Sequence, residues 1–402
     1  MKISYNIVKI NMRCQMRKAV GVVVEYNPFH NGHKYHCLKA RQHGDLVIAV
    51  MSGDYVQRGE PALINRWERA ELALKNGVDI VVELPIFYST QSAEIFSRGA
   101  VGLLNLMGVE KIVFGSESGD IQSLKERADL EELDEFKEEL KKQLKEGHSY
   151  PTAYSNTLKK LKQGLELNSN DILGVEYIKA LKFWKSDIEP VAIKREKSGY
   201  YSEGIEDGIS SATGIRKKLE LGEEIKEVVP ASTYEVLNAA LEENRFARLK
   251  DFYPFIRHKI LLEKESLKEI QDLEDGYENR LYEAAFKYSN YEDFFKSIQS
   301  KRFTIGRTQR ILIHILLGIK KSDIEIVKNR IPYVRVLGFT KDGQSYLKSL
   351  KEKEVEILTT LKNIQRILSV EDLKFLEMNE IASKIYSIVN EYEEKKIPIM
   401  IR

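Results

Sequence analysis

Residues 19–36 read Ala-Val-Gly-Val-Val-Val-Glu-Tyr-Asn-Pro-Phe-His-Asn-Gly-His-Lys-Tyr-His. The apolar, mostly β-branched run from Val20 to Val24 predicts a strand that is buried on both faces. Pro28 ends this strand, because proline cannot donate to a strand ladder and biases the residue before it away from a helix. A helical pattern begins at Asn31 and continues to about Gln42. The stretch therefore predicts a strand, a tight loop and the first turns of a helix.

Two histidines, His30 and His33, stand at the predicted junction of loop and helix, with Gly32 between them. Glycine has no side chain, so a bulky anion can approach the backbone closely here. The N–H groups of a helix N-terminus favour negative charge, and imidazoles beside them can donate to phosphate oxygens. The pattern predicts a phosphate site, although a lone histidine would more simply cap the helix. For His36, further along the helix, a ligand contact and a supporting or surface position are both open.

The chain beyond this stretch alternates between apolar strands and helices as far as residue 230. We predict further strands at residues 45–51, 78–84, 111–114 and 190–194. Such alternation is typical of an α/β fold with a doubly wound parallel sheet. Ligands of these sheets bind beyond the carboxyl ends of the strands. The loop that carries the histidines is therefore expected to lie among other binding loops.

A second hydroxyl-rich loop, at residues 209–217, reads Ile-Ser-Ser-Ala-Thr-Gly-Ile-Arg-Lys. Ser211 or Thr213 can cap a helix that starts near Gly214, which would gather hydroxyls, backbone N–H groups and Arg216. Alone, this is an ordinary cap with a surface arginine as readily as a phosphate clamp. Beside the histidines, a clamp on a nucleoside triphosphate is favoured, with further cations at Arg58 and Arg195.

Composition sets limits on the class of protein. With 402 residues and 43% hydrophobic content, the chain has room for two domains of a globular protein. Its 63 Lys and Arg against 61 Asp and Glu give a net charge of +2, so any RNA surface must be local. Two cysteines exclude a disulfide framework and a Cys-rich metal site, and they suit a cytoplasmic location. No apolar run approaches the length of a membrane span, so we expect no membrane partner.

We divide the chain into three segments. Residues 1–15 precede Met16, where we expect translation to start, and so form a disordered or mis-annotated leader. Residues 16–230 carry the alternating pattern and are expected to form the catalytic domain that binds the nucleoside triphosphate. Residues 231–402 are mainly helical in pattern, with two short extended pieces expected near 334–337 and 355–358, and we assign them to one helical domain.

The helical segment contains a basic stretch. Residues 301–330 hold eight Lys or Arg against two acidic residues. Within it, Gly306-Arg-Thr-Gln-Arg310 opens an apolar helix, whose polar start can meet a backbone phosphate, and each neutralised phosphate adds salt-dependent affinity. We predict RNA contact here, with a solvated basic face as the alternative. The predicted contact residues are Arg302, Arg307, Arg310, Lys320 and Lys321.

Several motifs together resemble one known family. They are Glu25-Tyr-Asn-Pro-Phe-His-Asn-Gly-His33, Met51-Ser-Gly53, Gln57-Arg-Gly-Glu-Pro-Ala62, Glu83-Leu-Pro85, Phe114-Gly-Ser-Glu117, Asn170-Asp-Ile-Leu-Gly174 and Ile193-Lys-Arg195. The His-Asn-Gly-His string resembles the HxGH motif of the nucleotidyltransferase superfamily, which includes class I aminoacyl-tRNA synthetases. The longer strings resemble the bacterial tRNA(Met) cytidine acetate ligases over residues 18–217 at least. The resemblance implies a nucleotidyltransferase-like Rossmann sheet.

The resemblance also implies a reaction in two steps. Acetate would attack the α-phosphate of ATP to give acetyl-adenylate and pyrophosphate. The N4 amine of the wobble cytidine of elongator tRNA(Met) would then take the acetyl group and AMP would leave, forming N4-acetylcytidine. The implied partners are thus ATP, acetate and elongator tRNA(Met), with Mg²⁺ held chiefly by the nucleotide. The helical domain would grip the tRNA while the cytidine is unstacked.

Carried over by position, the resemblance assigns roles to named residues. His30 and His33 would stabilise the transition state, with Asn27 as a further catalytic candidate. The ATP contacts would be Val23, Val24, Glu25, Tyr26, Asn27, Pro28, Phe29, His30, Asn31, Gly32, His33, Lys34, Tyr35, His36, Gly115, Asn170 and Arg195. Ser211, Thr213 and Arg216 match the superfamily's ISSTxxR loop with one extra residue, so which hydroxyl meets phosphate stays open. Gln57 and Arg58 are our candidates for the rim of the acetate pocket, and we predict no protein metal site.

Two other functions fit the same residues. A small-molecule nucleotidyltransferase would need the same loops without a basic helical domain. A non-catalytic RNA-binding factor would tolerate loss of His30 with no chemical effect. The oligomeric state is left open by the sequence.

Overall fold

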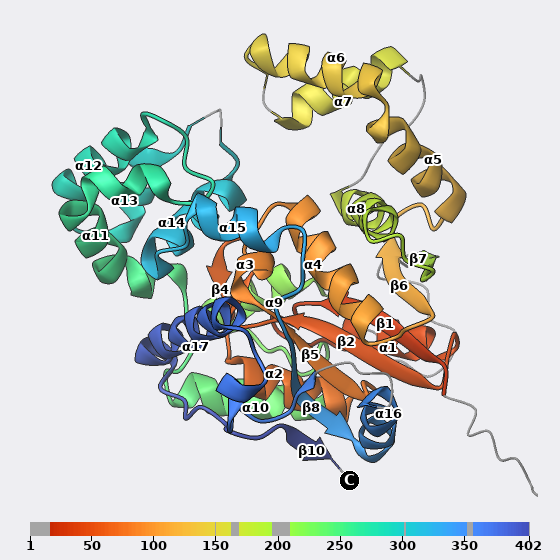
Figure 1. The fold of residues 1–402 in the computed structure, drawn as a ribbon. Coiled ribbons are helices and arrows are strands. Elements are labelled where there is room, and N and C mark those ends of the chain that lie inside the picture. The colour runs from red at the N-terminus through yellow and green to blue at the C-terminus, as the bar shows by residue number, and fades with distance from the viewer. Residues whose placement is uncertain are drawn as a thin grey trace, which may run out of the picture.

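The computed structural model describes residues 17–148, 150–161, 169–194, 210–300, 303–351 and 357–401 of the chain (Figure 1). The leader predicted at residues 1–15 lies outside these ranges, as do Arg195 and Arg302. None of the helices that the described residues form is long and apolar enough to cross a lipid bilayer.

One large sheet forms the centre of the molecule. Its strands lie in the order β10 (Ile399–Ile401), β8 (Val334–Thr340), β5 (Ile80–Leu84), β2 (Leu46–Ser52), β1 (Ala19–Val24), β6 (Lys111–Ser116) and β7 (Glu189–Lys194), while β9 (Ile357–Leu358) pairs with β8. Neighbouring strands run parallel except β5 and β8, which are antiparallel. The predicted α/β fold is confirmed, with the histidine-bearing strand β1 near the middle of the sheet.

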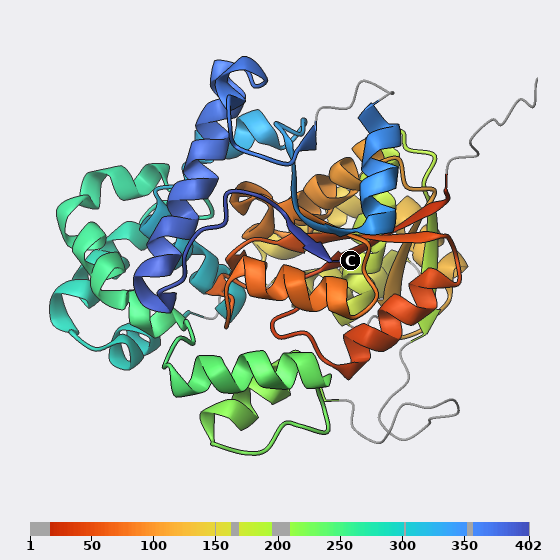
Figure 2. The same cartoon turned by 90° about the horizontal axis from the view of Figure 1, so that it is seen from below.

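Helices cover both faces of the sheet, because successive side chains of its apolar strands point to opposite sides. One face is covered by α1 (Asn31–Arg41), α2 (Arg66–Lys75), α9 (Ala212–Glu220) and α10 (Ala231–Glu242), seen together in Figure 2. The other face is covered by α4 (Ala93–Leu106), α8 (Ser169–Phe183) and α16 (Lys341–Lys351). In β2, Val47 belongs to the first core and Ile48 to the second. This double burial explains why the strand reads as a continuous apolar run.

Three smaller pieces complete the sheet part. The short hairpin β3 (Tyr55–Val56) and β4 (Glu60–Pro61) follows β2, and α3 (Ile86–Ser89) follows β5. An arm of three helices lies between β6 and α8, and Figure 1 shows its α6 and α7 standing away from the sheet. The arm consists of α5 (Ile121–Glu132), α6 (Asp134–Lys145) and α7 (Tyr150–Leu161).

A helical body follows the sheet part at residues 249–327, and α17 packs against it. Its elements are η1 (Leu249–Phe252), α11 (Tyr253–Leu262), η2 (Lys264–Glu269), α12 (Tyr277–Lys287), α13 (Tyr291–Ile298), α14 (Ile305–Leu317) and α15 (Lys321–Val327). Two further elements, η3 (Ile364–Arg366) and α17 (Val370–Asn390), follow β9 in the chain. The apolar cluster beneath α4 continues without a break into this body. The sheet part and the helical body therefore share one core.

The predicted boundary at residue 230 differs from the structure. Within the segment 231–402, α10 covers the sheet, and β8 and β10 are strands of that sheet. The two extended pieces predicted near 334–337 and 355–358 correspond to β8 and β9, but the pairing of β8 with β5 was not foreseen. Pairing between strands about 250 residues apart leaves no local pattern in the sequence, so periodicity alone assigned the whole segment to one helical domain.

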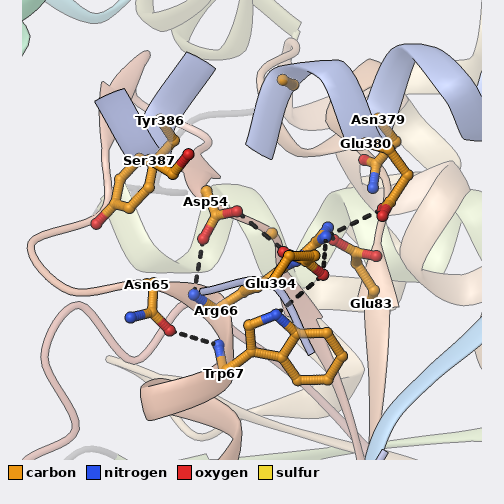
Figure 3. A network of polar contacts seen from close by, with 12 residues as sticks. Asp54, Asn65, Arg66, Trp67, Glu83, Asn379, Glu380, Tyr386, Ser387 and Glu394 are labelled. Atoms are coloured by element: carbon orange, nitrogen blue, oxygen red, sulfur yellow. Dashed lines mark hydrogen bonds and ion pairs between the residues drawn. The ribbon is translucent and has the colours of Figure 1, made fainter. Parts of the chain in front are cut away.

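A buried ion-pair network fastens the C-terminal residues to the sheet part (Figure 3). The fully buried Arg66 pairs with Glu83, with Glu380 at 3.0 Å and with Glu394 at 2.8 Å. Arg335 of β8 pairs with the same acids. Burial by itself raises the pKa of Glu83, but the positive charges on Arg66 and Arg335 hold that pKa below its ordinary value. Residues from α2, β5, β8 and the C-terminal segment thus form one charged cluster.

Candidate active site at the carboxyl end of β1

Residues 25–33, which comprise the loop between β1 and α1 and the first residues of α1, are called the histidine loop below. Tyr26 and Phe29 are fully buried and their ring centroids lie 4.6 Å apart. The Tyr26 hydroxyl lies 3.3 Å from the Cys37 sulfur, so the loop is anchored beneath α1. The peptide between Asn27 and Pro28 is cis. With its apolar side chains held inward, the loop presents its backbone and imidazoles at the carboxyl end of the sheet.

The two histidines of the loop lie together at the start of α1. His30 is the N-cap residue, and its ring stacks on that of His33 with centroids 3.7 Å apart and an interplanar angle of 23°. The His30 backbone N–H donates to Nδ1 of His33 at 3.4 Å, so the proton of neutral His33 lies on Nε2. The first turn of α1 has no acidic residue. A helix N-terminus with two imidazoles suits an anion, as the sequence predicts.

The remaining residues predicted to contact ATP in this stretch have different positions. Val23 and Val24 lie within β1, while Lys34, exposed, and Tyr35 and His36, both half-buried, lie further along α1. The Asn31 side chain donates to the carbonyl of Glu227 at 2.9 Å. Asn31 therefore ties the start of α1 to the segment that precedes α10.

Asn27 links three segments around the loop. Its side-chain oxygen accepts from the backbone N–H of Leu63 at 2.8 Å, and its carbonyl accepts from Arg216 at 2.8 Å. The side chain is buried. This geometry gives Asn27 a positioning role, and its predicted catalytic role stays a prediction.

The second predicted loop faces the first. The Ser211 hydroxyl accepts from the backbone N–H of Gly214 at 3.1 Å and caps α9, which begins at Ala212. Arg216 reaches the Asn27 carbonyl, the Thr213 hydroxyl at 3.4 Å and Glu60 at 3.4 Å. The structure thus brings Arg216 and Thr213 beside the histidine loop, while the Ser211 oxygen is engaged as a helix cap.

The end of β6 forms another wall. Gly115 lies in β6 opposite Ile193 of β7, and Asn170 lies in the first turn of α8. Asp171, which the sequence analysis did not single out, accepts from the Ser116 hydroxyl at 2.6 Å and from the Glu117 N–H at 3.0 Å. Asp171 therefore positions the loop after β6. Asp171 could have been predicted from the sequence, because it stands within the Asn-Asp-Ile-Leu-Gly motif.

One further charged residue, Arg69, was not predicted from the sequence and shapes the site. Arg69 is fully buried and donates to the carbonyls of Glu25 at 2.7 Å and Ser52 at 3.0 Å, as well as to those of Gly53 and Ile64. Its signal was the Arg-Trp-Glu-Arg string at the start of a helix, where a spacing of three places both arginines on one side. Arg69 thus clamps the backbones of three loops.

Glu25 carries an unusual charge environment within the histidine loop. Its carboxylate accepts from the Gln57 N–H at 2.7 Å. Burial raises the pKa of Glu25 above its ordinary value, although the Gln57 N–H and the charges on Arg216, Arg69 and Arg58 act in the opposite direction. The carboxylate fixes the loop that carries Gln57 against the histidine loop.

The residues proposed for the acetate rim divide between two environments. Besides its backbone bond to Glu25, Gln57 donates from its amide to the carbonyl of Gln91 at 3.0 Å. Arg58 is exposed, and its neighbour Gly59 touches the backbone of α14, because an added Cβ would lie 2.2 Å from the Arg310 nitrogen. Gln57 thus links two loops and Arg58 lies at the joint between the sheet part and the helical body, and their place at the rim of the acetate pocket stays a prediction.

The four predicted RNA contacts of the segment 301–330 that lie within the described residues are engaged within the protein. Arg307 pairs with Glu274 at 2.8 Å and Arg310 with Asp272 at 2.9 Å. Lys320 pairs with Glu269 at 2.7 Å, and Lys321 donates to the Lys268 carbonyl at 2.8 Å. These acidic partners come from residues 269–274, outside the basic stretch. Much of its apparent positive charge is therefore neutralised, and its contact with RNA stays a prediction.

A cavity of about 240 Å³ opens beside the histidine loop, between the sheet part and the helical body. It is lined by Glu60, Pro61, Leu63, Arg216, Glu220, Ala247, Arg248, Leu249, Lys250, Tyr291, Glu292 and Gln309. Arg216 and Leu63 touch Asn27 and also line the cavity. In the parts of the chain that the structure describes, no three or more His, Cys, Asp or Glu gather to hold a metal ion.

Comparison with known proteins agrees with this geometry. A family profile described as HIGH Nucleotidyl Transferase matches residues 17–398. A tRNA(Met) cytidine acetate ligase of Fusobacterium nucleatum is 47% identical over 397 residues, which span 95% of this chain and 98% of that protein. One of Caldicellulosiruptor saccharolyticus is 44% identical over 378 residues, spanning 92% and 94%. A crystal structure of Thermotoga maritima TmcAL bound with alpha-thio ATP superposes with a TM-score of 0.87 at 34% identity, covering 96% of this chain and all of that one.

Proposed function

Because this chain belongs to the tRNA(Met) cytidine acetate ligase family of the HIGH nucleotidyltransferases, we propose that it acetylates N4 of the wobble cytidine of elongator tRNA(Met) with acetate and ATP. The observation that supports this most directly is the stacked pair of His30 and His33 at the N-terminus of α1, with Arg216 beside the same loop. These groups suit the activation of a carboxylate by adenylylation. The tRNA specificity rests on the relatives' names.

In the first step, an oxygen of acetate attacks the α-phosphorus of ATP and the bond to pyrophosphate breaks. Negative charge grows on the oxygens around that phosphorus. The imidazoles of His30 and His33 are already stacked side by side at the start of α1, so they can stabilise this charge without rearrangement. The relative from Thermotoga maritima was crystallised with alpha-thio ATP, which supports ATP as the nucleotide here. Mg²⁺ would enter with the triphosphate, whose oxygens are the ligands that it prefers.

In the second step, the N4 amine attacks the acetyl carbonyl carbon, the C–N bond forms and AMP leaves. The residues proposed to bind ATP, from Val23 to His36 with Gly115, Asn170 and Arg195, keep that role in the proposal. Thr213 and Arg216 face the phosphates, and Ser211 acts by capping α9. Acetate as the acyl donor and a cytoplasmic location are parts of the same proposal.

The direct test is nucleoside analysis of tRNA after incubation with the protein, ATP and labelled acetate. We expect labelled N4-acetylcytidine, and acetate-dependent exchange of pyrophosphate into ATP in the absence of tRNA. Exchange that required a phosphomonoester instead of acetate would favour a small-molecule nucleotidyltransferase. If a correctly folded protein showed neither of these activities, the result would contradict the proposal.

Replacement of the histidines tests the catalytic assignment. His30→Ala and His33→Ala should each lower acetate-dependent exchange by roughly 10²–10³, the usual effect of removing one donor to a developing oxyanion. His258→Ala, which changes an exposed histidine on α11, is the matched control and should leave exchange unchanged. A loss of only a few-fold for His30→Ala would remove this residue from catalysis.

A further inference from the structure

We propose that the cavity between β4, α9 and α13–α14 receives a cytosine base turned out of an RNA strand, with Glu60 and Gln309 reading its N4 edge and Tyr291 stacking on its ring. This inference rests on the proposed function, since it identifies where the acetyl acceptor binds. On this proposal the RNA contact lies at the joint between the sheet part and the helical body rather than in the basic segment 301–330.

The position of the cavity fits an acceptor site. Arg216 forms one of its walls and also donates to the Asn27 carbonyl of the histidine loop. Leu63, on another wall, donates its N–H to the Asn27 side chain. The cavity therefore lies directly beside the histidine loop, and Arg216 and Leu63 contact both. The volume of about 240 Å³ lies below the roughly 300 Å³ at which sites for drug-sized ligands begin, so it suits a single ring.

The polar groups of the cavity match the edge of cytosine. The Glu60 carboxylate accepts from the Gln309 amide at 3.1 Å and from Arg216 at 3.4 Å, and its side chain is about one-third exposed, at 30%. Carboxylates accept hydrogen bonds from the N4 amine of cytosine, and the adjacent amide can donate to ring N3. Uracil presents a carbonyl oxygen where cytosine has the amine, and this oxygen would face the carboxylate. The pair therefore favours cytosine over uracil.

The aromatic surface of the cavity is held rigidly. Tyr291 is half-buried, and its ring stacks on Phe295 with centroids 5.3 Å apart and packs against Tyr253 at 6.0 Å. Burial raises the pKa of Tyr291, and the charges on Glu60 and Glu292 raise it further, so the phenol stays neutral. A fixed, neutral aromatic ring is the platform on which proteins stack an unstacked RNA base.

Charged groups surround the opening. Arg248 and Lys250 line the cavity from the segment before α11, with Lys250 exposed and Arg248 lying 3.6 Å from Glu220. These cations suit the phosphates on either side of the flipped base. The exposed Glu220 and Glu292 also line the cavity, so its cationic contact is confined to one side.

The same placement identifies the group that accepts the proton which N4 loses during acetyl transfer. As the N4 nitrogen bonds to the acetyl carbon and the bond to the AMP oxygen breaks, N4 loses one proton. Glu60, hydrogen-bonded to that amine, takes the proton and returns it to solvent. AMP leaves as the phosphate anion, so atoms and charge balance without another reactant.

The test separates the two chemical steps. Tyr291→Ala should leave acetate-dependent pyrophosphate exchange unchanged and lower kcat/KM for tRNA acetylation by roughly 5- to 150-fold, the factor for loss of stacking under one base. Tyr291→Phe should retain most of the acetylation. Phe286→Ala, which removes an aromatic ring that is 73% exposed on α12, is the control and should change neither activity.

The outcomes distinguish this inference from the function beneath it. Wild-type protein without acetylation would contradict the proposed function. Wild-type acetylation together with unchanged kcat/KM in Tyr291→Ala would overturn the cavity assignment alone. If Tyr291→Ala loses exchange because it misfolds, Tyr291→Leu, which keeps the apolar volume without the ring, replaces it under the same criteria.

A binding measurement without ATP tests the base reading. Wild-type protein should bind an anticodon stem-loop with cytidine at the wobble position roughly 5- to 150-fold more tightly than the same RNA with uridine. Glu60→Gln should reduce this preference, because a rotated amide can donate to the uracil oxygen. Equal affinities in the wild type, or an unchanged preference in Glu60→Gln, would overturn the role of Glu60.

Discussion

The histidine loop and the basic segment 301–330 each place several charged or protonatable side chains close together in the sequence, but the fold uses them differently. In the loop, His30 and His33 are three residues apart at a helix start, so local geometry alone brings their rings to 3.7 Å. In the basic segment, Arg307 and Arg310 also share one side of a helix. Their partners, Glu274 and Asp272, come from a separate segment and neutralise them.

The two regions differ in how well their sequence patterns predict the arrangement of charges in the folded protein. A motif that depends only on neighbouring residues and a helix N-terminus has the same local arrangement in the folded protein as its sequence predicts. A run of basic residues predicts binding to a polyanion only if acidic residues on the neighbouring elements do not neutralise it. The cavity beside Arg216 makes the same point, because its walls come from five separate parts of the chain.

The largest expected effect concerns the support of the histidine loop. Arg69→Met should lower the free energy of unfolding by about 3–5 kcal/mol, because it leaves buried carbonyls of several loops without their donor. Lys75→Met, at the exposed end of the same helix, should change it by less than about 1 kcal/mol. Urea denaturation of both variants measures the difference. Similar values for the two would show that the loop does not depend on Arg69.

A smaller effect tests the neutralised side of the comparison. Burial raises the pKa of Asp272, but the charges on His314, Arg310 and Arg307 together hold it below its ordinary value. A lowered carboxyl pKa contributes stability that is present above the unfolded-state pKa, about 3.9, and is lost as the pH falls through the folded-state value. Asp272→Asn should therefore destabilise the protein at pH 7 by about 1.5–3 kcal/mol.

The deficit of the same variant should be smaller at an acidic pH than at pH 7, because protonation of Asp272 in the wild type removes the charge that its cationic neighbours stabilise. Thermal unfolding at the two pH values gives the comparison, with Asp275→Asn, a carboxylate in the neighbouring turn, as the control. A deficit that is equal at both pH values would show that Asp272 contributes through packing rather than through charge.

The smallest effect concerns salt dependence. Lys250→Ala should weaken tRNA binding and lower the slope of log affinity against log salt by about 1, because an exposed cation at the cavity loses its phosphate contact. Arg310→Ala should leave the slope nearly unchanged, since Asp272 already pairs with this arginine. Filter binding between 50 and 200 mM salt distinguishes them. The reverse order of slopes would restore the basic segment as the RNA contact.

Sequence reasoning alone reached a large part of the fold and of the site. The apolar runs predicted the strands from β1 to β7 that form the parallel sheet, because strands buried on both faces carry their signal locally. The His-Asn-Gly-His string predicted two histidines at the start of a helix, where the structure has them, and their binding of an anion stays a prediction. The serine-rich loop predicted the cap of α9, and Arg216 lies beside the histidine loop, while its role as a phosphate clamp stays a prediction.

Other features depend on contacts between distant segments, which local patterns do not specify. The return of β8 and β10 to the sheet depends on pairing with strands far away in the chain. The buried Arg66 and Arg69 resembled ordinary charged residues at a helix start, and their burial depends on acids and carbonyls from other elements. Such contacts arise from long-range packing, which periodicity and motif spacing do not encode.

The sequence by itself determined the strand, loop and helix that carry the two imidazoles, because backbone propensity and residue spacing act over a few residues. The tertiary structure decided which charges remain available, which are paired, and where a cavity opens beside Arg216. These outcomes depend on electrostatic and packing contacts between segments tens to hundreds of residues apart, and such contacts exist only once the sheet part and the helical body share one core.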